Sequence, residues 1–279
     1  MNSLELVCIV VVAVWFVFRS LAHQGSRRDL YGRALLIAVS AWVAEDSAIR
    51  LYGFYAYAPD RWTVWVDQVP LLILLIWPVV VTAAIDLLEA LAVRPGRWPG
   101  LMGVLVVADA WFIEPAAVDA GLWSWTSPGP FSIPTIGILG WGFFAVGVGV
   151  VRWRRWPMMA MPLVAPLVCH ALLLLSWWGA FRWIVHPIPE LAMAVVGWVA
   201  AVVVVSAISW FRPRGLRLQV LLRAPAAVFF FGLLCRYGQD PDDGPLVVWC
   251  QAFAPPWLAL LLLSTWPVST GSVATPAAR

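Results

Sequence analysis

Long apolar runs separated by short polar segments constrain this chain more than any other feature. The chain has 279 residues, of which 62% are hydrophobic and 12% are charged. A helix needs about 20 apolar residues to cross the hydrocarbon core of a bilayer, and only helices and closed barrels satisfy all their backbone groups there. The sequence therefore predicts an all-α, polytopic transmembrane helix bundle without a separate soluble domain.

Nine apolar runs have the length of a membrane span, and the eighth is the shortest of them. They predict about eight or nine transmembrane helices in a single domain over residues 1–268, followed by a small, polar, disordered tail at 269–279. The predicted spans are 3–22, 30–51, 67–92, 99–119, 133–151, 157–180, 188–211, 219–236 and 246–267.

The distribution of arginine predicts how the bundle is oriented. Arginines gather in the segments after the first, third, fifth and seventh predicted spans, whereas the alternate segments hold few arginines and most of the loop aspartates. Because basic loops stay on the cytoplasmic side, we expect the N-terminus outside and the C-terminus in the cytoplasm. The arginines of the first group are Arg27, Arg28, Arg94, Arg97, Arg152, Arg154, Arg155, Arg212, Arg214 and Arg217.

Two segments, at about 40–80 and 108–145, repeat one another. Each contains an acid, then a glycine, then an aromatic-x-aromatic triplet, and finally a tryptophan seven residues after a proline. The first unit has Glu45, Gly53, Tyr55-Ala56-Tyr57, Pro70 and Trp77, and the second has Glu114, Gly121, Trp123-Ser124-Trp125, Pro134 and Trp141. Both acids lie near the outer end of an outward-running span, so we expect parallel internal repeats related by an axis along the membrane normal.

The acids of these units are candidate functional groups, because a carboxyl group inside a membrane is costly. Glu45 has no basic residue three or four positions after it, and desolvation favours its neutral form. Asp46 is four residues before Arg50, so it is either half of a structural ion pair or a third catalytic acid. Glu114 precedes Pro115, which predicts that the helix ends or kinks there beside a cavity.

Aromatic side chains at matched distances from the two acids are candidate binding residues. On position alone they form an interfacial belt, but the similar offsets of the triplets from the acids favour a shared site, since the acid precedes the glycine by eight residues in the first unit and by seven in the second. Aromatic faces beside an acid would stabilise a developing carbocation. These candidates are Tyr55, Tyr57, Trp77, Trp123, Trp125 and Trp141.

Other kinds of site lack a sequence signature. The three histidines, at positions 23, 170 and 186, have no metal-ligand spacing, and no glycine-rich phosphate loop is present, so we expect neither a metal nor another cofactor. The chain has no concentrated basic surface and is not expected to bind nucleic acid. Asp109, deeper in the fourth span, must be paired, protonated or facing a wet cavity.

The repeated units resemble those of the membrane carotenoid-biosynthesis proteins, which include the carotenoid 1,2-hydratases and the bisanhydrobacterioruberin hydratases. The resemblance covers roughly residues 40 to 145. It is carried by Glu45, Gly53-Phe54-Tyr55-Ala56-Tyr57, Val69-Pro70, Trp77, Glu114-Pro115, Gly121-Leu122-Trp123-Ser124-Trp125, Pro134 and Gly140-Trp141. The chain is also similar, more distantly, to the small-subunit type of membrane lycopene cyclases.

This resemblance implies hydration, or alternatively cyclisation, of the end group of a polyene isoprenoid through acid-initiated carbocation chemistry, with Glu45 and Glu114 as the acid and base. It implies an apolar polyene or isoprenoid lipid as substrate, membrane lipids as surroundings, other carotenoid-pathway enzymes as partners, and the bacterial inner membrane as location. Two alternatives stay open at this point. One is a non-catalytic lipid- or carotenoid-binding membrane protein, and the other is a proton-coupled transporter.

Overall fold

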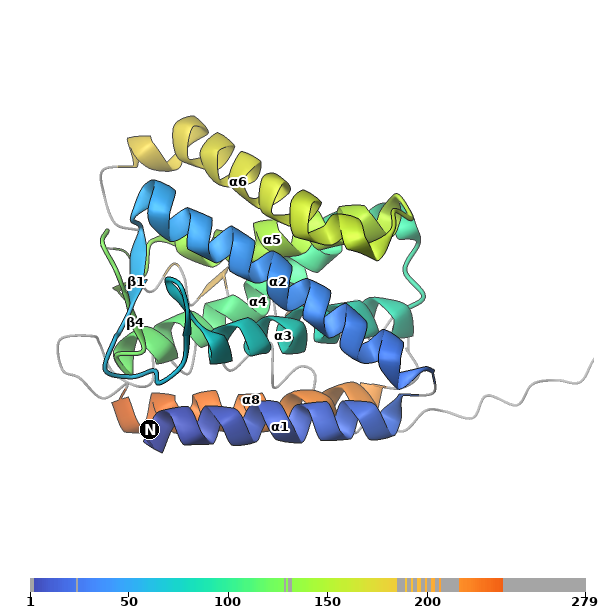
Figure 1. Cartoon of the computed structure of the whole chain (residues 1–279). Coiled ribbons are helices and arrows are strands. Elements are labelled where there is room, and N and C mark those ends of the chain that lie inside the picture. The colour runs from blue at the N-terminus through green and yellow to red at the C-terminus, as the bar shows by residue number, and fades with distance from the viewer. Residues whose placement is uncertain are drawn as a thin grey trace, which may run out of the picture.

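A computed structural model describes residues 3–184 apart from 24, 128, 130 and 131, scattered positions between 189 and 206, and residues 216–237. Seven long helices dominate these residues (Figure 1). They are α1 (Ser3–Ala22), α2 (Arg27–Tyr52), α3 (Leu71–Ala90), α4 (Trp98–Asp119), α5 (Thr135–Trp153), α6 (Met161–Gly179) and α8 (Leu216–Tyr237). The all-α class predicted from the sequence is thereby confirmed.

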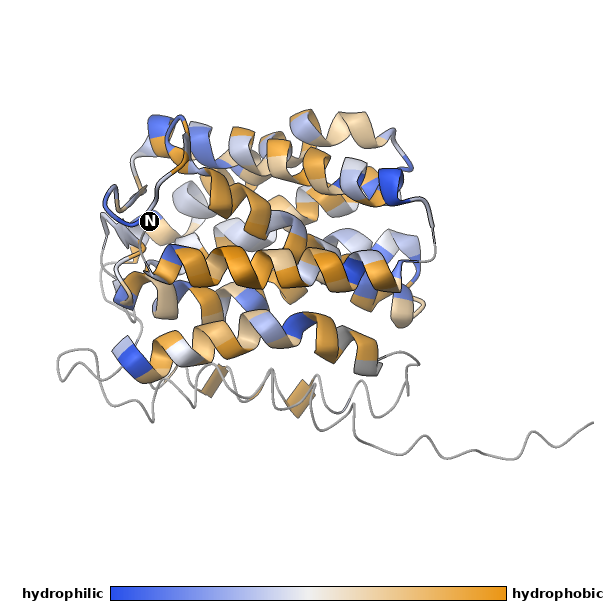
Figure 2. Cartoon of the chain, turned by 60° about the horizontal axis from the view of Figure 1, so that its bottom comes forward, coloured by the Kyte–Doolittle hydropathy of each residue, from blue (hydrophilic) through white to orange (hydrophobic). Residues whose placement is uncertain are grey.

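Each of these helices lies where an apolar run predicted a span. Six of them are long and apolar enough to cross a membrane, and the exception is α2, which has more polar residues. The helices carry apolar side chains along most of their length, with hydrophilic residues concentrated toward their ends (Figure 2). These features indicate an integral membrane protein. Only scattered positions of the span predicted at 188–211 are described, and the span predicted at 246–267 and the tail at 269–279 lie outside the described residues.

The helices are arranged so that their ends form two distinct faces. Helices α2 and α6 pack together on one side of the bundle, and α1 and α8 pack together on the other (Figure 1). One end carries the short strands and is called the ribbon end below. The opposite end, called the arginine-rich end, carries Arg27, Arg28, Arg94, Arg97, Arg152, Arg154 and Arg155.

Glycine and proline set the borders of the helices at the ribbon end. Helix α2 stops at Gly53, whose φ of 60° is in the left-handed region that costs glycine little. Gly121 follows α4 with a φ of 67°. Pro70 and Pro134 stand in extended conformation immediately before α3 and α5, where the missing N–H of proline is not needed for the helix.

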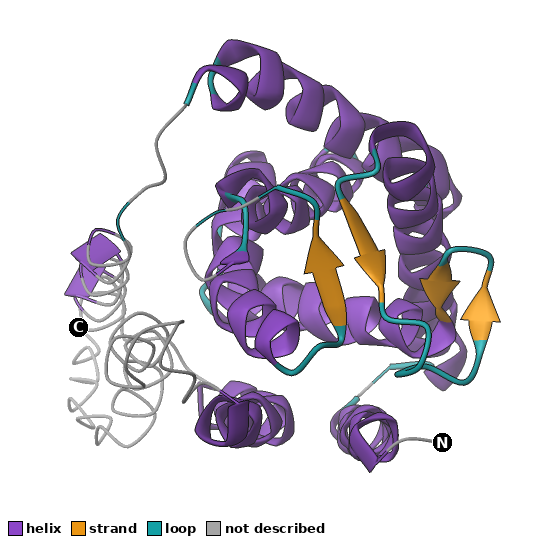
Figure 3. Cartoon of the chain, turned by 90° about the vertical axis from the view of Figure 1, so that its left-hand side faces the viewer, coloured by secondary structure: helices purple, strands orange, loops and turns teal. Residues whose placement is uncertain are grey.

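A two-stranded ribbon crosses the ribbon end of the bundle. Strands β1 (Tyr55–Tyr57) and β4 (Trp123–Trp125) pair antiparallel, with Ala56 opposite Ser124 at the centre. Figure 3 shows this ribbon lying across the ends of the surrounding helices. A smaller hairpin, β2 (Trp65–Val66) with β3 (Val69–Pro70), lies beside it. Both triplets fall between predicted spans, and their pairing is a finding of the structure.

Helix α4 departs from its prediction at Pro115. The helix continues through Glu114 and Pro115 to Asp119, as the apolar run at 99–119 predicted, so it does not end at Glu114, which was one of the two outcomes expected beside Pro115. The proline forfeits one backbone hydrogen bond, but Glu114, Pro115, Ala116 and Ala117 are all buried. Packing of this segment against its neighbours compensates for the local preference, and the result is that Glu114 stays on a regular helix inside the bundle.

Candidate functional site

Five carboxyl groups are buried in the described part of the bundle, and their partners separate them into two kinds. Asp86 pairs with Arg19 and Asp109 pairs with Arg223, each at 2.8 Å. Glu5 accepts hydrogen bonds from the backbone and hydroxyl of Thr63. Among the described residues, Glu45 and Glu114 have no cationic partner, although only 7% and 2% of their surfaces are exposed. Glu5 also has no ion pair there, but Glu45 and Glu114 differ from it because they face a cavity inside the bundle and their donors are aromatic side chains.

Three aromatic side chains hold the Glu45 carboxyl group. Tyr55 Oη donates to Oε2 at 3.2 Å and Tyr57 Oη donates to the same oxygen. Trp77 Nε1 donates to Oε1. The two phenols come from β1 and the indole from α3, so the acid on α2 is fixed by the strand and the helix that follow it in sequence.

The Glu114 carboxyl group is held in the corresponding way by three indoles. Trp123 and Trp125 donate through Nε1 to Oε2 at 2.9 and 3.0 Å, and Trp141 Nε1 donates to Oε1 at 2.5 Å. The donors occupy the positions that Tyr55, Tyr57 and Trp77 occupy in the first unit. Matched positions in the sequence thus make matched contacts in space, with phenols replaced by indoles.

The two sets of aromatic residues meet and form one structure, called the aromatic cage here. It comprises Tyr55, Tyr57, Trp77, Trp123, Trp125 and Trp141. The indoles of Trp77 and Trp141 stack with centroids 4.5 Å apart and planes inclined by 29°. Across the ribbon, Tyr55 lies 4.9 Å from Trp125 and Tyr57 lies 5.8 Å from Trp123, centroid to centroid.

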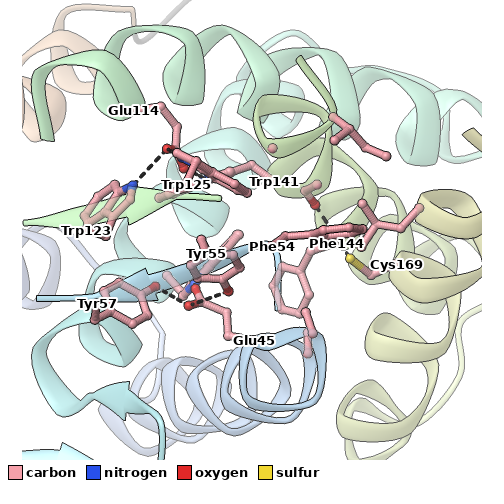
Figure 4. Close-up of a pocket in the computed structure, with 17 residues that line it drawn as sticks. Glu45, Phe54, Tyr55, Tyr57, Glu114, Trp123, Trp125, Trp141, Phe144 and Cys169 are labelled. Atoms are coloured by element: carbon pink, nitrogen blue, oxygen red, sulfur yellow. Dashed lines mark hydrogen bonds between the residues drawn. The ribbon is translucent and has the colours of Figure 1, made fainter. Parts of the chain in front are cut away.

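Glu45, Glu114 and the whole cage line a single cavity of about 70 Å³. Figure 4 shows the two carboxyl groups approaching it from different sides, with aromatic rings between them. The structure therefore brings together eight of the nine residues that the sequence indicated. The ninth, Asp46, does not line the cavity. It accepts from Arg50 Nε at 2.9 Å and from the backbone N–H of Gln68 at 3.2 Å.

Sequence reasoning missed the apolar wall of the cavity. Small and apolar side chains close it on the sides of α2, α5 and α6 (Figure 4). Helical spacing could have found some of them, because Ala48 follows Glu45 by three residues and Phe144 follows Trp141 by three. The contributions of α6 had no sequence signal. The wall residues are Ala44, Ala48, Phe54, Ile136, Gly137, Gly140, Phe144, Cys169 and Leu173.

A polar cluster beside the cavity joins α2 to α6. His170 Nε2 lies 2.7 Å from Ser47 Oγ, and His170 Nδ1 lies 2.9 Å from Tyr52 Oη. The Ser47 hydroxyl donates to the carbonyl of Val43, so Ser47 accepts from Nε2–H and Tyr52 donates to Nδ1. With both ring nitrogens engaged, His170 joins α2 to α6 as a hydrogen-bonded packing residue.

The two tyrosines on the ribbon remain in their neutral form over a wide pH range. Their rings are partly exposed, whereas their hydroxyls point inward to Glu45. Burial, and secondly the neighbouring Glu45 carboxyl, raise the pKa of both Tyr55 and Tyr57 well above the ordinary value. Both hydroxyls are therefore available as proton donors or acceptors.

Within the described residues, no group of three or more histidine, cysteine, aspartate or glutamate side chains is arranged to hold a metal ion. Comparisons of the chain with protein-family models, with curated proteins and with solved structures find no match. The geometry of the site is therefore what indicates its chemistry.

Proposed function

We propose that this protein is a membrane enzyme that adds water to the end group of an acyclic polyene isoprenoid by acid-initiated carbocation chemistry. The observation that carries the proposal is the pair of carboxyl groups, Glu45 and Glu114, which are buried without an ion pair to any described residue and face one apolar, aromatic-lined cavity. An apolar cavity of this kind suits an alkene, and the buried acids suit proton transfer to and from it.

The hydrogen-bond donors assign different roles to the two acids. A phenol can rotate its hydroxyl and accept a hydrogen bond from a protonated carboxyl group, whereas an indole N–H can only donate a hydrogen bond. A protonated Glu45 can thus donate a hydrogen bond to the hydroxyl of Tyr55 or Tyr57. A protonated Glu114 would find no acceptor among its three indole partners. We infer that Glu45 is the resting general acid and that Glu114 is the resting carboxylate.

The reaction then proceeds in balanced steps. Glu45 gives its proton to the terminal carbon–carbon double bond, leaving a tertiary carbocation on the substrate and a carboxylate on Glu45. The charge of Glu114 and the faces of Trp77 and Trp141 stabilise this cation. The oxygen of a water molecule bonds to the cation, and Glu114 takes the proton that the water releases. Return of that proton from Glu114 to Glu45, through water in the cavity, restores the enzyme.

The size of the cavity favours hydration over ring closure. An engineered protein cavity of about 150 Å³ admits a benzene molecule, and the cavity here is about 70 Å³. A branched alkene end is smaller than a closed six-membered ring with its methyl groups. We therefore propose a tertiary alcohol as product rather than a cyclic end group.

We also infer that the two units are parallel internal repeats, with the N-terminus outside the cell and the predicted eight or nine spans in the bacterial inner membrane. The antiparallel pairing of β1 with β4 about Ala56 and Ser124 supports a two-fold axis through the ribbon, along the direction of the bundle. The arginine-rich end supports the proposed orientation.

The test is turnover of an acyclic polyene by the purified full-length protein in lipid nanodiscs, in water enriched in heavy oxygen. Mass spectrometry should find a product heavier by one labelled water. Glu45→Gln should lower turnover by at least ~100-fold, the usual contribution of a general acid, and Asp46→Asn is the matched control that should retain it. A product of unchanged mass with altered absorption would instead indicate cyclisation. A bound but unaltered polyene would support the lipid-binding alternative.

A further inference from the structure

A second cleft lies at the arginine-rich end of the bundle, far along the helices from the aromatic cage. It has a volume of about 250 Å³ and is open to the surroundings. Two arginines and two tryptophans line it, together with apolar side chains. Its lining includes Trp98, Val151, Arg152, Arg155, Trp156 and Met158.

The cleft carries an excess of positive charge. Arg152 donates to Glu89 at 2.6 Å, and its guanidinium lies 4.9 Å from the centroid of the Trp98 ring. Arg155 forms no ion pair with any residue that the structure describes. Two guanidinium groups thus line the cleft and only that of Arg152 is paired with a carboxylate among the described residues, and the guanidinium fork is suited to the oxygens of a phosphate group.

The backbone of Arg155 turns the chain out of α5 beside the cleft. Helix α5 ends at Trp153, and Arg155 follows with a φ of 54°, in the left-handed region. The N–H of Trp156 bonds to the carbonyl of Val151 at 3.1 Å and closes the helix end. Glycine adopts this conformation without strain, whereas arginine adopts it at some cost in backbone energy. The same conformation occurs at Ala92 after α3, so the hydrogen bonds of the helix end offset this cost.

The surroundings of the cleft suit a lipid better than a free anion. Met158 leads directly to α6, where Leu163 and Leu167 are four residues apart on one face and are 65% and 59% exposed. Val151 and Met158 provide an apolar floor beside the arginines. Trp98 and Trp156 have the amphipathic rings that concentrate at the level of lipid headgroups.

We propose that this cleft binds the phosphate headgroup of an anionic membrane lipid, whose acyl chains lie along the exposed face of α6. Arg152 and Arg155 contact the phosphate oxygens, and the leucines of α6 contact the chains. The arginine-rich end faces the leaflet where anionic headgroups attract basic residues. This site is separate from the aromatic cage and does not depend on the proposed hydratase reaction.

The test is thermal unfolding of the full-length protein in neutral detergent with added phosphatidylglycerol, phosphatidylcholine or inorganic phosphate. Phosphatidylglycerol should raise the unfolding midpoint by roughly 5 °C when its concentration is far above its dissociation constant. Phosphatidylcholine and inorganic phosphate should each produce a much smaller shift. An equal shift with inorganic phosphate would overturn the assignment to a lipid, and the absence of a shift with phosphatidylglycerol would overturn the site.

Two substitutions separate this site from general surface charge. Arg155→Gly should lose more than half of the phosphatidylglycerol shift, while its midpoint without lipid stays equal or rises because the backbone strain is removed. Arg154→Gln is the matched control, since Arg154 lies over Trp153 at 4.8 Å and does not line the cleft. The control should keep most of the shift. Equal losses in the two variants would overturn the proposal, and Arg155→Gln provides the same comparison if the glycine variant does not fold.

Discussion

Glu45 and Glu114 each accept hydrogen bonds from three aromatic side chains at equivalent positions, yet only one of the two sets of donors contains hydroxyl groups. Two phenols and an indole surround Glu45, whereas three indoles surround Glu114. Both acids are buried, and neither forms an ion pair with a residue that the structure describes. The chemical difference between them therefore lies in what their partners can do.

The protonation state that each buried carboxyl group can adopt depends on whether its partners can accept hydrogen bonds as well as donate them. Tyr55 and Tyr57 can either donate to Glu45 or accept from it. Trp123, Trp125 and Trp141 can only donate, so they favour a group that is solely an acceptor. The first half of the cage can hold a neutral acid, and the second half is built for an anion.

The largest effect on stability is expected when each acid is replaced by its amide. In Glu114→Gln an amide N–H must face an indole N–H, and we expect a loss of about 1–3 kcal/mol of unfolding free energy for the unsatisfied buried group. In Glu45→Gln the amide can donate to the phenols while its oxygen accepts from Trp77, so the loss should be below about 1 kcal/mol. Unfolding in mixed micelles measures both. Equal losses would contradict the distinction between the two halves.

A double substitution sharpens this result by removing the opposing donor. In the background of Trp141→Phe, the cost of Glu114→Gln should shrink by about 1 kcal/mol, a typical coupling between contacting residues. Trp98→Phe is the control background, because Trp98 donates to the carbonyl of Val93 at the arginine-rich end. A full cost in both backgrounds would show that the N–H of Trp141 is not the cause.

A dependence on alkaline pH should belong to the Glu45 half alone, since only that half contains tyrosines. The pKa of Tyr55 and Tyr57 is raised in the folded protein, so their stabilising contribution is complete below the unfolded value of about 10. It should decline as the pH rises above that value. The double variant Tyr55→Phe/Tyr57→Phe should lose less stability between pH 9 and 11 than the unchanged protein, as followed by tyrosinate absorbance and unfolding; an identical loss would argue against this origin.

The smallest effect is expected outside the cage, at Asp67, which pairs with the same arginine as Asp46, the neighbour of Glu45. Asp46 and Asp67 share the exposed Arg50, and this pairing lowers the pKa of Asp67. Any stabilisation by Asp67 is therefore present above its unfolded pKa of about 4 and is lost as the pH falls below it. Because exposed pairs contribute little, Asp67→Asn should leave the unfolding midpoint at pH 7 almost unchanged. A large shift would show that the ribbon end depends on this pair.

Most of the described long helices could be predicted because the length of an apolar run in the sequence indicates a helix that can span a membrane. Each described long helix lies within a few residues of an apolar run, since a bilayer demands an uninterrupted apolar helix wherever the chain crosses it. The apolar run also predicted the end of α4 at Asp119, whereas the local preference beside Pro115 did not predict that the helix continues there. The local effect of Pro115 pointed to a break, and burial of the segment around it overrode that effect.

The candidate site was likewise predicted in part. The repeated pattern in the sequence was sufficient to select Glu45, Glu114 and the six aromatic residues, because the two units place the same kinds of residue in the same order, with equal glycine-to-triplet and proline-to-tryptophan spacings. It could not separate Asp46 from them. Its distance from the cavity follows from adjacency on a helix, where consecutive residues point in different directions, and from its bond to Arg50.

The sequence by itself determined that this chain forms apolar helices and that two acids in it have matched aromatic neighbours. These are properties of short segments, for which composition and spacing are enough. Only the tertiary structure decided that β1 and β4 pair, that Trp77 stacks on Trp141 and that both acids face one cavity. Those contacts join residues tens of positions apart, and their formation depends on how the helices pack around them rather than on any local preference.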